Sequence, residues 1–200
     1  MKTARFKRAA LAAVLLLLTA ALCACSGERK ITKAEVAEVL PTLVEKSKAL
    51  NEIYFGDGFP PEGSAALPEN GYYYVDSEYY GFYSIEQIKE ATEEVFTPEY
   101  SHILYASAFD GLANEDTVTP PRYAEGELGL MQSVRSTVYD LAERSFDFET
   151  LKLKKANRTR ATVSVETTDE NGGKATIELI VVRTTDETGA ATYRLDSPTY

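Results

Sequence analysis

The sequence has little of the residue chemistry on which most catalytic and metal sites depend. Its 200 residues include one histidine, two cysteines and no tryptophan. Both cysteines, Cys23 and Cys25, lie within the first 25 residues. The rest of the chain therefore offers no internal disulfide, thiolate nucleophile or cysteine-ligated metal site. Its stability has to come from an ordinary hydrophobic core.

Basic residues are also scarce outside the N-terminus. The chain has 21 lysines and arginines against 31 aspartates and glutamates, which gives a formal net charge of −10. Lys2, Arg5, Lys7 and Arg8 stand in the first eight positions, which hold no acidic residue, so removing this segment would take the charge to −14. We expect so negative a domain to be a poor binder of nucleic acid or of a broad anionic lipid surface.

A basic start followed by a short apolar run is typical of an export signal. The run at 9–21 is too short for a comfortable transmembrane helix and lies where the hydrophobic region of a signal peptide belongs. It ends in Leu22-Cys23-Ala24-Cys25, which resembles the bacterial lipobox. We predict a lipoprotein signal peptide at 1–24, lipid attachment at Cys25 and a lipidated tether at 25–31. The alternative is an ordinary signal peptide cleaved slightly later.

The predicted anchor also sets the expected location. Lipid on Cys25 would hold the folded part, residues 32–200, at the extracytoplasmic side of the cell membrane. The segment 26–30 spans at most about 18 Å when extended, so the domain should stay close to the bilayer. Cleavage leaves 176 residues, which is enough for one domain, and nothing in the sequence marks a boundary within them.

The first helix is predicted from its start signal and its periodicity. Thr32-Lys33-Ala34-Glu35 is typical of a capping box, and apolar residues then recur at helical spacing as far as Tyr54. Pro41 lies inside this pattern, and we expect it to kink or restart the helix. A short strand is expected at 72–75, after a polar loop.

Two further helices have clear start signals. Ser84-Ile85-Glu86-Gln87 forms a second capping box, and Thr97-Pro98 places an N-cap before a proline at the first helical position. The third helix is expected to stop near Gly111. The side chains predicted to face inward are Ile88, Ala91 and Val95 on the second helix, and Tyr100, Ile103 and Leu104 on the third.

From residue 151 the apolar pattern changes to a period of two. Alternation at 151–154 and 161–166 indicates strands, and 175–182 becomes apolar on both faces, which favours a central strand. Turns at 167–172 and 184–189 end in glycine, as hairpins do. The predicted inward positions are Leu151, Leu153, Val163, Val165, Ile177, Leu179 and Val181. The order predicts an α+β fold, with two or three N-terminal helices packed on a curved antiparallel β-meander.

Several stretches resemble a group of mostly uncharacterised Firmicute lipoproteins. They are Ala49–Gly56, Tyr83–Ile85, Val95–Tyr100 and the closing Arg194–Tyr200. The group ends in W-R-L-D-S-P-T-Y, and Tyr193 stands here where the tryptophan is expected. The group is similar to cystatin-like and nuclear transport factor 2-like rolls. Some members resemble bacterial DL-endopeptidase inhibitors of the IseA type, which block NlpC/P60-type wall hydrolases. The resemblance implies that fold and a non-catalytic role, and it assigns no inhibitory residue.

No constellation of catalytic or metal-binding residues is evident. His102 should lie on the exposed side of its helix, and a lone histidine without cysteine suits neither a metal site nor a triad. The glutamates within 86–94 share one helix face, whereas glycosidases need two carboxyl groups that converge across a cleft. Asp169-Glu170-Asn171 lacks the spacing of a calcium-binding loop. We therefore expect no enzyme activity, cofactor or metal.

Two surface features allow more than one interpretation. The basic run at 152–160 either contacts an anionic wall polymer or acidic partner, or places lysines on an exposed strand to discourage edge pairing. The tyrosine-dense segment at 72–83 suits a protein or glycan interface, with Tyr79, Tyr80 and Tyr83 near the contact. Tyrosine is equally favoured in strands for packing alone.

Two classes of function follow from these features. The first is a non-catalytic binding module, specifically an inhibitor or regulator of a cell-wall hydrolase. The second is a roll-fold protein that holds a small ligand or acts on it by Asp, Glu and Tyr acid–base chemistry. The predicted inward strand positions are all apolar, which favours the binding module. The expected partners are the membrane, through the lipid, and a wall hydrolase or wall polymer.

Overall fold

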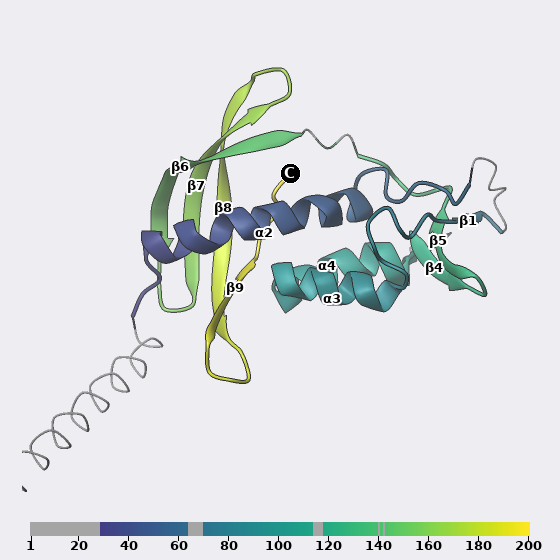
Figure 1. The fold of residues 1–200 in the computed structure, drawn as a ribbon, viewed down its shortest axis with the longest axis horizontal. Coiled ribbons are helices and arrows are strands. Elements are labelled where there is room, and N and C mark those ends of the chain that lie inside the picture. Colours follow the sequence, from purple (N-terminus) through teal and green to yellow (C-terminus); the bar gives the residue numbers. More distant parts are fainter. Residues whose placement is uncertain (1–28, 64–69, 114–117, 140, 142) are drawn as a thin grey trace, which may run out of the picture.

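The computed structural model describes residues 29–63, 70–113, 118–139, 141 and 143–200. The predicted signal peptide and Cys25 lie outside these residues. Within the described ranges, no helix is long and apolar enough to cross a membrane. The fold is α+β, as predicted, with helices packed against antiparallel sheets (Figure 1).

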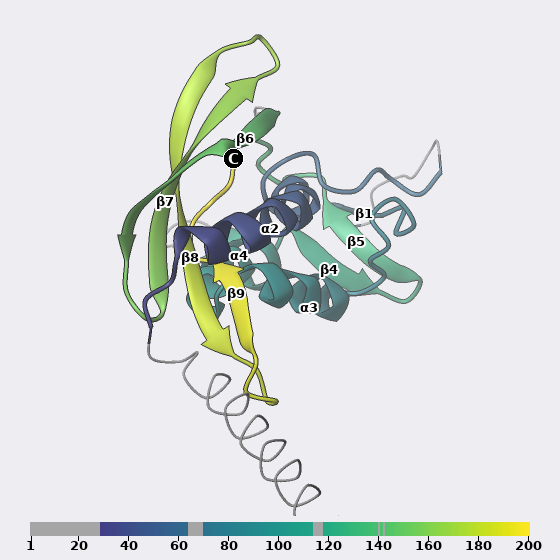
Figure 2. The same cartoon turned by 60° about the vertical axis from the view of Figure 1, so that its left-hand side comes forward.

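The C-terminal half forms a four-stranded antiparallel meander, which is strongly twisted (Figures 1 and 2). Its strands, in sheet order, are β6 (Arg144–Ala156), β7 (Arg160–Asp169), β8 (Lys174–Thr185) and β9 (Ala191–Leu195). β8 is flanked on both sides, which confirms the prediction of a central strand. Val163 pairs with Leu179 and Ala161 with Val181, and all four side chains are fully buried. Leu153 and Ile177, also predicted to face inward, are only half-buried.

The two similar turns form the predicted hairpins, and aspartate sets their shape. The Asp169 carboxylate accepts the backbone N–H groups of Asn171 and Gly173 at 2.9 and 2.7 Å. Asp186 accepts the equivalent N–H groups in the next hairpin. The Thr188 hydroxyl also donates to the Asp186 carboxylate, at 2.7 Å, and it lowers the pKa of Asp186 most, with the backbone N–H groups adding to the effect. Gly172 and Gly189 have φ of 80° and 84°, a left-handed conformation that glycine adopts without strain.

A long helix, α2 (Lys33–Tyr54), lies across the large sheet and contacts β6 and β9 (Figure 2). The predicted capping box is formed, since Thr32 N–H donates to the Glu35 carboxylate at 2.7 Å and Glu35 N–H donates to Thr32 Oγ1 at 3.3 Å. Of the two outcomes expected at Pro41, a kink or a restart, the restart is excluded, because the helix is continuous through it. Buried Leu40 and Leu43 on either side hold the flanking turns against the core.

The second predicted helix is α3 (Ile85–Val95), which contacts both β9 and β4. Ser84 Oγ accepts the Gln87 N–H at 3.2 Å, as a capping box requires. The box is only half formed, because the Gln87 side chain accepts the N–H of Tyr83 rather than that of Ser84. Ile88 and Val95 are buried, as predicted.

The third predicted helix is α4 (Pro98–Tyr105), extended by the π-helical turn η1 (Ala106–Asp110) up to Gly111. Thr97 caps it, as predicted, by accepting the Tyr100 N–H. The prediction that Ile103 faces inward is wrong, since its side chain is 68 % exposed. Ser101, Leu104 and Ala108 occupy the buried side instead, three and four residues apart along the helix.

A second sheet was not predicted from the sequence. It has the order β1-β5-β4, and a separate pair joins β2 to β3. The strands are β1 (Tyr72–Tyr74), β2 (Leu112–Ala113), β3 (Val118–Thr119), β4 (Tyr123–Gly126) and β5 (Gly129–Ser133). Tyr123 is fully buried, and its hydroxyl donates to the Ile53 carbonyl at 2.7 Å at the end of α2. Tyr123 and Leu130 of this sheet belong to the same buried cluster as Leu179 of the large sheet.

Candidate functional site

The three tyrosines predicted to lie near a partner are in the segment that joins β1 to α3, but their environments differ. Tyr79 and Tyr83 are 64 % and 56 % exposed. Tyr80 is half-buried, and its ring meets Phe59 edge-on with 5.1 Å between ring centroids. Tyr79 in turn packs edge-on against Tyr80 at 4.7 Å. Tyr80 therefore links the exposed Tyr79 to the core.

A hollow of about 370 Å³ lies beside Tyr83, between the turn after β1 and the β4–β5 hairpin. Leu128, at the tip of that hairpin, borders it and is 81 % exposed. No lysine or arginine lines this hollow among the residues that the structure describes. We call the exposed groups at this end of the molecule the tyrosine surface: Tyr79, Tyr83 and Leu128, with the carboxylates of Glu62, Asp76 and Glu78.

Leu128 is the member of this surface that sequence reasoning missed. Glycines stand at 126 and 129, and the pattern Gly-Glu-Leu-Gly is compatible with a hairpin tip. The strands on either side are too short to show a clear alternation. The structure shows that β4 and β5 pair up to Gly126 and Gly129, which leaves Leu128 in the turn.

Tyr80 has the protonation of an ordinary phenol at neutral pH. Burial raises the pKa of its hydroxyl to about 12, and nearby Glu52, Tyr79 and Asp57 add to the rise. Its deprotonated fraction is therefore negligible under physiological conditions. Tyr80 can donate a hydrogen bond, but it is a poor candidate for a general base.

We expect replacement of Tyr80 by alanine to lower stability, because its ring fills the space beside Phe59. The free energy of unfolding should fall by about 1–3 kcal/mol, less than for a fully buried aromatic residue. Tyr79→Ala is the matched control and should change it by less than about 1 kcal/mol. Denaturant unfolding of both variants measures this difference. Equal losses would contradict the assignment of Tyr80 to the edge of the core.

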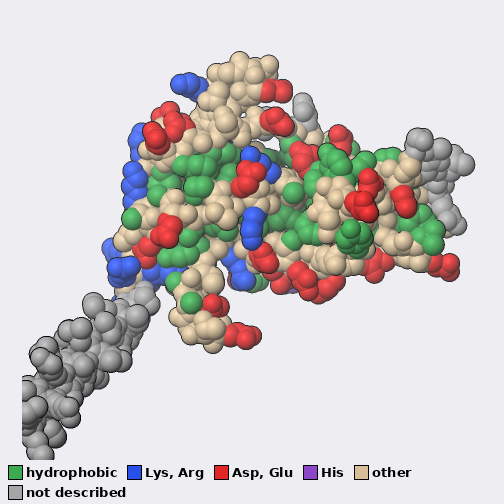
Figure 3. All heavy atoms as spheres, viewed as in Figure 1, with side chains coloured by type: hydrophobic (Ala, Val, Ile, Leu, Met, Phe, Trp, Pro, Cys, Tyr) green, Lys and Arg blue, Asp and Glu red, His purple; other side chains and the backbone are tan. Residues whose placement is uncertain are grey.

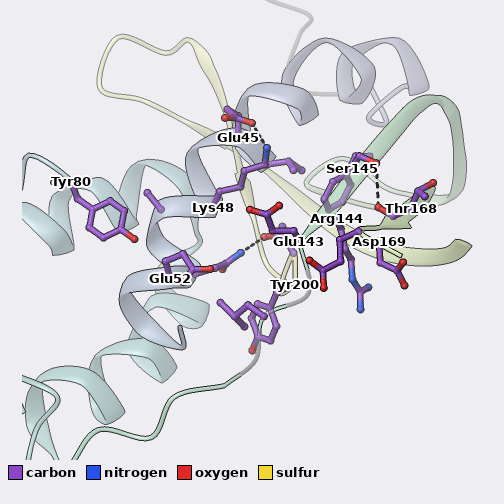
Figure 4. Close-up of a pocket in the computed structure, with 17 residues that line it drawn as sticks. Glu45, Lys48, Glu52, Tyr80, Glu143, Arg144, Ser145, Thr168, Asp169 and Tyr200 are labelled. Carbon is purple, nitrogen blue, oxygen red and sulfur yellow. Dashed lines mark hydrogen bonds and ion pairs between the residues drawn. The ribbon is translucent and has the colours of Figure 1, made fainter. Parts of the chain in front are cut away.

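A larger cleft, of about 670 Å³, lies between α2 and the part of the large sheet where β6 begins and β7 ends. Figure 4 shows α2 on one side of it, and the start of β6, the end of β7 and the C-terminal tail on the others. Lys48 pairs with Glu45 at 2.7 Å, and Ser145 Oγ donates to the Thr168 carbonyl at 3.2 Å. Its charged lining residues are Glu45, Lys48, Glu52, Glu143, Arg144, Asp169 and Glu170.

The residues weighed for catalysis have the predicted surface positions. His102 is exposed on α4, and its ring lies 6.4 Å from that of Tyr105. The four glutamates of α3 are exposed, and Glu94 pairs with Lys46 at 2.8 Å. No three of the described histidines, aspartates and glutamates are placed to hold a metal ion.

Three of the four stretches that carry the family resemblance, Ala49–Gly56, Val95–Tyr100 and Arg194–Tyr200, lie at packing contacts. Thr97 Oγ1 donates to the Asp196 carboxylate at 2.6 Å, and Asp196 pairs with Arg160 at 2.6 Å. Thr199 Oγ1 accepts the Asn51 side-chain amide at 2.8 Å. The closing segment therefore holds α2 and α4 against the large sheet. These contacts give the motifs a structural role and assign no chemistry to them.

Comparison with known proteins gives no identification. No family model matches the chain, and no curated protein is significantly similar to it. The assignment of a function therefore depends on the residues and contacts of this chain.

Proposed function

We propose that this protein is a lipoprotein, anchored at the extracytoplasmic side of the membrane, whose domain binds a protein partner through the tyrosine surface. The observation that carries the proposal is the solvent exposure of Tyr79, Tyr83 and Leu128 at one end of the fold. Tyrosines supply large contact area at a low entropy cost, and they are enriched where binding energy is concentrated. The Tyr79 ring packs against Tyr80, which packs against Phe59, so the Tyr79 side chain loses less conformational entropy on binding.

The partner that fits best is a cell-wall hydrolase with a basic surface. Glu62, Asp76 and Glu78 line the same hollow as Tyr83 and Leu128, and their charge would complement lysines and arginines on a partner. The resemblance to DL-endopeptidase inhibitors supports the same choice. The packing of α2 on a four-stranded meander supports a cystatin-like or nuclear transport factor 2-like roll. In this proposal the domain acts by occupying the hydrolase rather than by turning over wall material.

A rate measurement tests this proposal. A purified NlpC/P60-type endopeptidase would be assayed on a wall fragment with increasing amounts of the full protein. We expect the rate to fall as the protein is added, and the protein alone to leave the fragment intact. Cleavage by the protein alone would contradict the non-catalytic role, and a rate unaffected at high concentration would contradict the hydrolase as partner.

The anchor leads to a second prediction. Cys25→Ala removes the sulfur at the predicted acylation position, so the variant should leave the membrane fraction or accumulate as the uncut precursor. Metabolic labelling with a fatty-acid analogue measures the change, and Cys23→Ala is the control that should keep the label. Label that persists on the Cys25 variant would show that the lipid is attached elsewhere.

The larger cleft supports a second candidate function, the binding of a small ligand. Its volume of about 670 Å³ lies within the range of ligand pockets. Its lining is more charged than that of most such pockets, which makes this candidate the weaker one. Ala49 lies in the cleft wall, so Ala49→Trp should displace a bound molecule. Native mass spectrometry of the full protein and this variant would reveal a ligand that only the former retains.

A further inference from the structure

Cationic side chains gather at the end of the molecule where the N-terminal segment joins the fold, on the left in Figure 3. They come from the residues before α2, from the first turn of α2, from β6, from the β6–β7 turn and from the start of β7. We call this group the basic end, and its members are Arg29, Lys30, Lys33, Lys152, Lys154, Lys155, Arg158 and Arg160, all exposed. An otherwise acidic chain therefore has a locally positive surface.

Few of these charges are neutralised by neighbours. Within the described ranges, the ion pairs of the basic end are Arg29 with Glu35 at 3.4 Å and Arg160 with Asp196 at 2.6 Å. Lysines on β6, an edge strand, would discourage edge pairing, but that purpose does not explain cations beyond the strand. Lys33 in particular stands in the first turn of α2, where the helix dipole disfavours positive charge.

The fold fixes the exit of the N-terminal segment beside these cations. Ile31 N–H donates to the Asn157 carbonyl at 2.9 Å. The buried guanidinium of Arg183 donates to the backbone carbonyls of Arg29 and Arg158 at 2.6 and 2.5 Å. From Arg29 back to Cys25 the chain can extend by at most about 14 Å. A lipid on Cys25 would therefore hold the basic end at the level of the headgroups.

We propose that the basic end is a membrane-facing surface that binds the anionic phosphate headgroups of the bilayer and points the tyrosine surface away from it. This inference rests on the proposed lipid anchor at Cys25. The lipid on Cys25 secures the attachment, so the basic residues would fix the orientation of the domain rather than its membrane binding. Each basic side chain at an anionic surface favours contact by about five-fold.

The negative net charge does not oppose this arrangement. Charges interact strongly only within about 10 Å at 0.1 M salt, so the local surface decides what the bilayer attracts. β4 and β5 lie at the opposite end of the long axis from the β6–β7 turn (Figure 1), and the carboxylates of Glu62, Asp76 and Glu78 stand beside their hairpin. The bilayer would repel that end. The sequence-based expectation against lipid surfaces considered only the total charge.

Energy transfer from the protein to the bilayer tests the proposal. The full-length lipoprotein, purified from membranes, would be reconstituted in vesicles with a fluorescent acceptor on the headgroups. Cleavage of the signal peptide would remove Cys23, and acylation would block the thiol of Cys25. An introduced cysteine would then be the only free thiol. Thr159→Cys would report on the basic end and Glu127→Cys, in the β4–β5 hairpin, on the other. Co-flotation of protein and vesicles would show separately that the anchor works.

We expect transfer from residue 159 to exceed transfer from residue 127 several-fold in vesicles containing phosphatidylglycerol. The difference should shrink in phosphatidylcholine vesicles and in 1 M salt, where charges interact only within about 3 Å, because the tether alone would then hold the basic end near the bilayer. Lys152→Glu/Lys154→Glu/Lys155→Glu should likewise reduce the difference to the value that the tether alone gives, by lowering contact on the order of a hundred-fold or more. Lys46→Glu/Lys48→Glu/Lys174→Glu makes the same change in net charge elsewhere and should preserve it.

Three results would overturn the proposal while leaving the anchor intact. One is equal transfer from both labels on vesicles that float with the protein. Another is an asymmetry that reversal of the three β6 lysines leaves unchanged, since the tether alone would then orient the domain. The third is binding of soluble poly(glycerol phosphate) that needs the same lysines, without any orientation on vesicles, which would assign the basic end to a wall polymer. Failure to float would instead contradict the proposed anchor.

Discussion

Replacement of Leu179 by alanine is expected to lower the free energy of unfolding by about 2–5 kcal/mol. Leu179 is fully buried on the core face of β8, the strand that pairs with both β7 and β9. It lies opposite Val163, which is also fully buried. The missing methyl groups would leave a cavity that strands held on both sides cannot close, so the cost includes lost burial and lost packing.

The denaturant midpoint, compared with that of Ile180→Ala, measures this effect. Ile180 is next along the same strand, faces the other side of the sheet and is only half-buried. Its truncation should cost less than that of Leu179. An unchanged midpoint for Leu179→Ala, or a larger loss for Ile180→Ala, would mean that the strand register is wrong by one residue.

Replacement of Arg122 by methionine is expected to have the second large effect on stability. Arg122 is buried, and its guanidinium donates to the carbonyls of Gly56 and Thr137 and to the Tyr123 hydroxyl. Methionine keeps much of the volume but supplies no donor. Gly56 is buried, and a buried carbonyl left without a partner costs about 1–3 kcal/mol, whereas water can reach the carbonyl of the exposed Thr137.

Arg135→Met is the matched control for this prediction. Arg135 is exposed, so its replacement should leave the midpoint of thermal or denaturant unfolding nearly unchanged. The Arg122 variant should unfold earlier, and because Arg122 connects the end of α2 to β4, amide exchange should rise in β4 and β5. Stability equal to that of the control would show that water or neighbouring groups replace the guanidinium.

The helices and the large sheet could be predicted because their signals are local. Thr32, Ser84 and Thr97 each accept a backbone N–H from three residues further along, so the sequence alone identifies the helix starts. The hairpins of the meander are likewise set by an aspartate and a glycine within six residues. The period-two pattern then fixes which side chains face the core.

The rest could not be predicted because it depends on contacts between distant segments. β1 pairs with β5, so that Tyr73 lies opposite Gln132, and no local pattern indicates that pairing. Tyr80 is less exposed than Tyr79 and Tyr83 because its ring packs against Phe59, which is distant in the sequence. The basic end likewise depends on Arg183, whose guanidinium holds the backbone at Arg29 and Arg158 together. Nothing in the sequence distinguishes this buried arginine from the exposed arginines. Such positions become clear only when the fold is known.

The central claim is that the tyrosine surface binds a wall hydrolase, and a dissociation constant tests it most directly. Tyr79→Ser/Tyr83→Ser would be compared with Tyr139→Ser/Ile103→Ser, whose side chains are 57 % and 68 % exposed elsewhere on the molecule. We predict that the first pair weakens binding of an NlpC/P60-type endopeptidase by about ten-fold or more at an unchanged unfolding midpoint, while the control pair binds normally. Equal affinities for the two variants and the unmodified protein would contradict the claim.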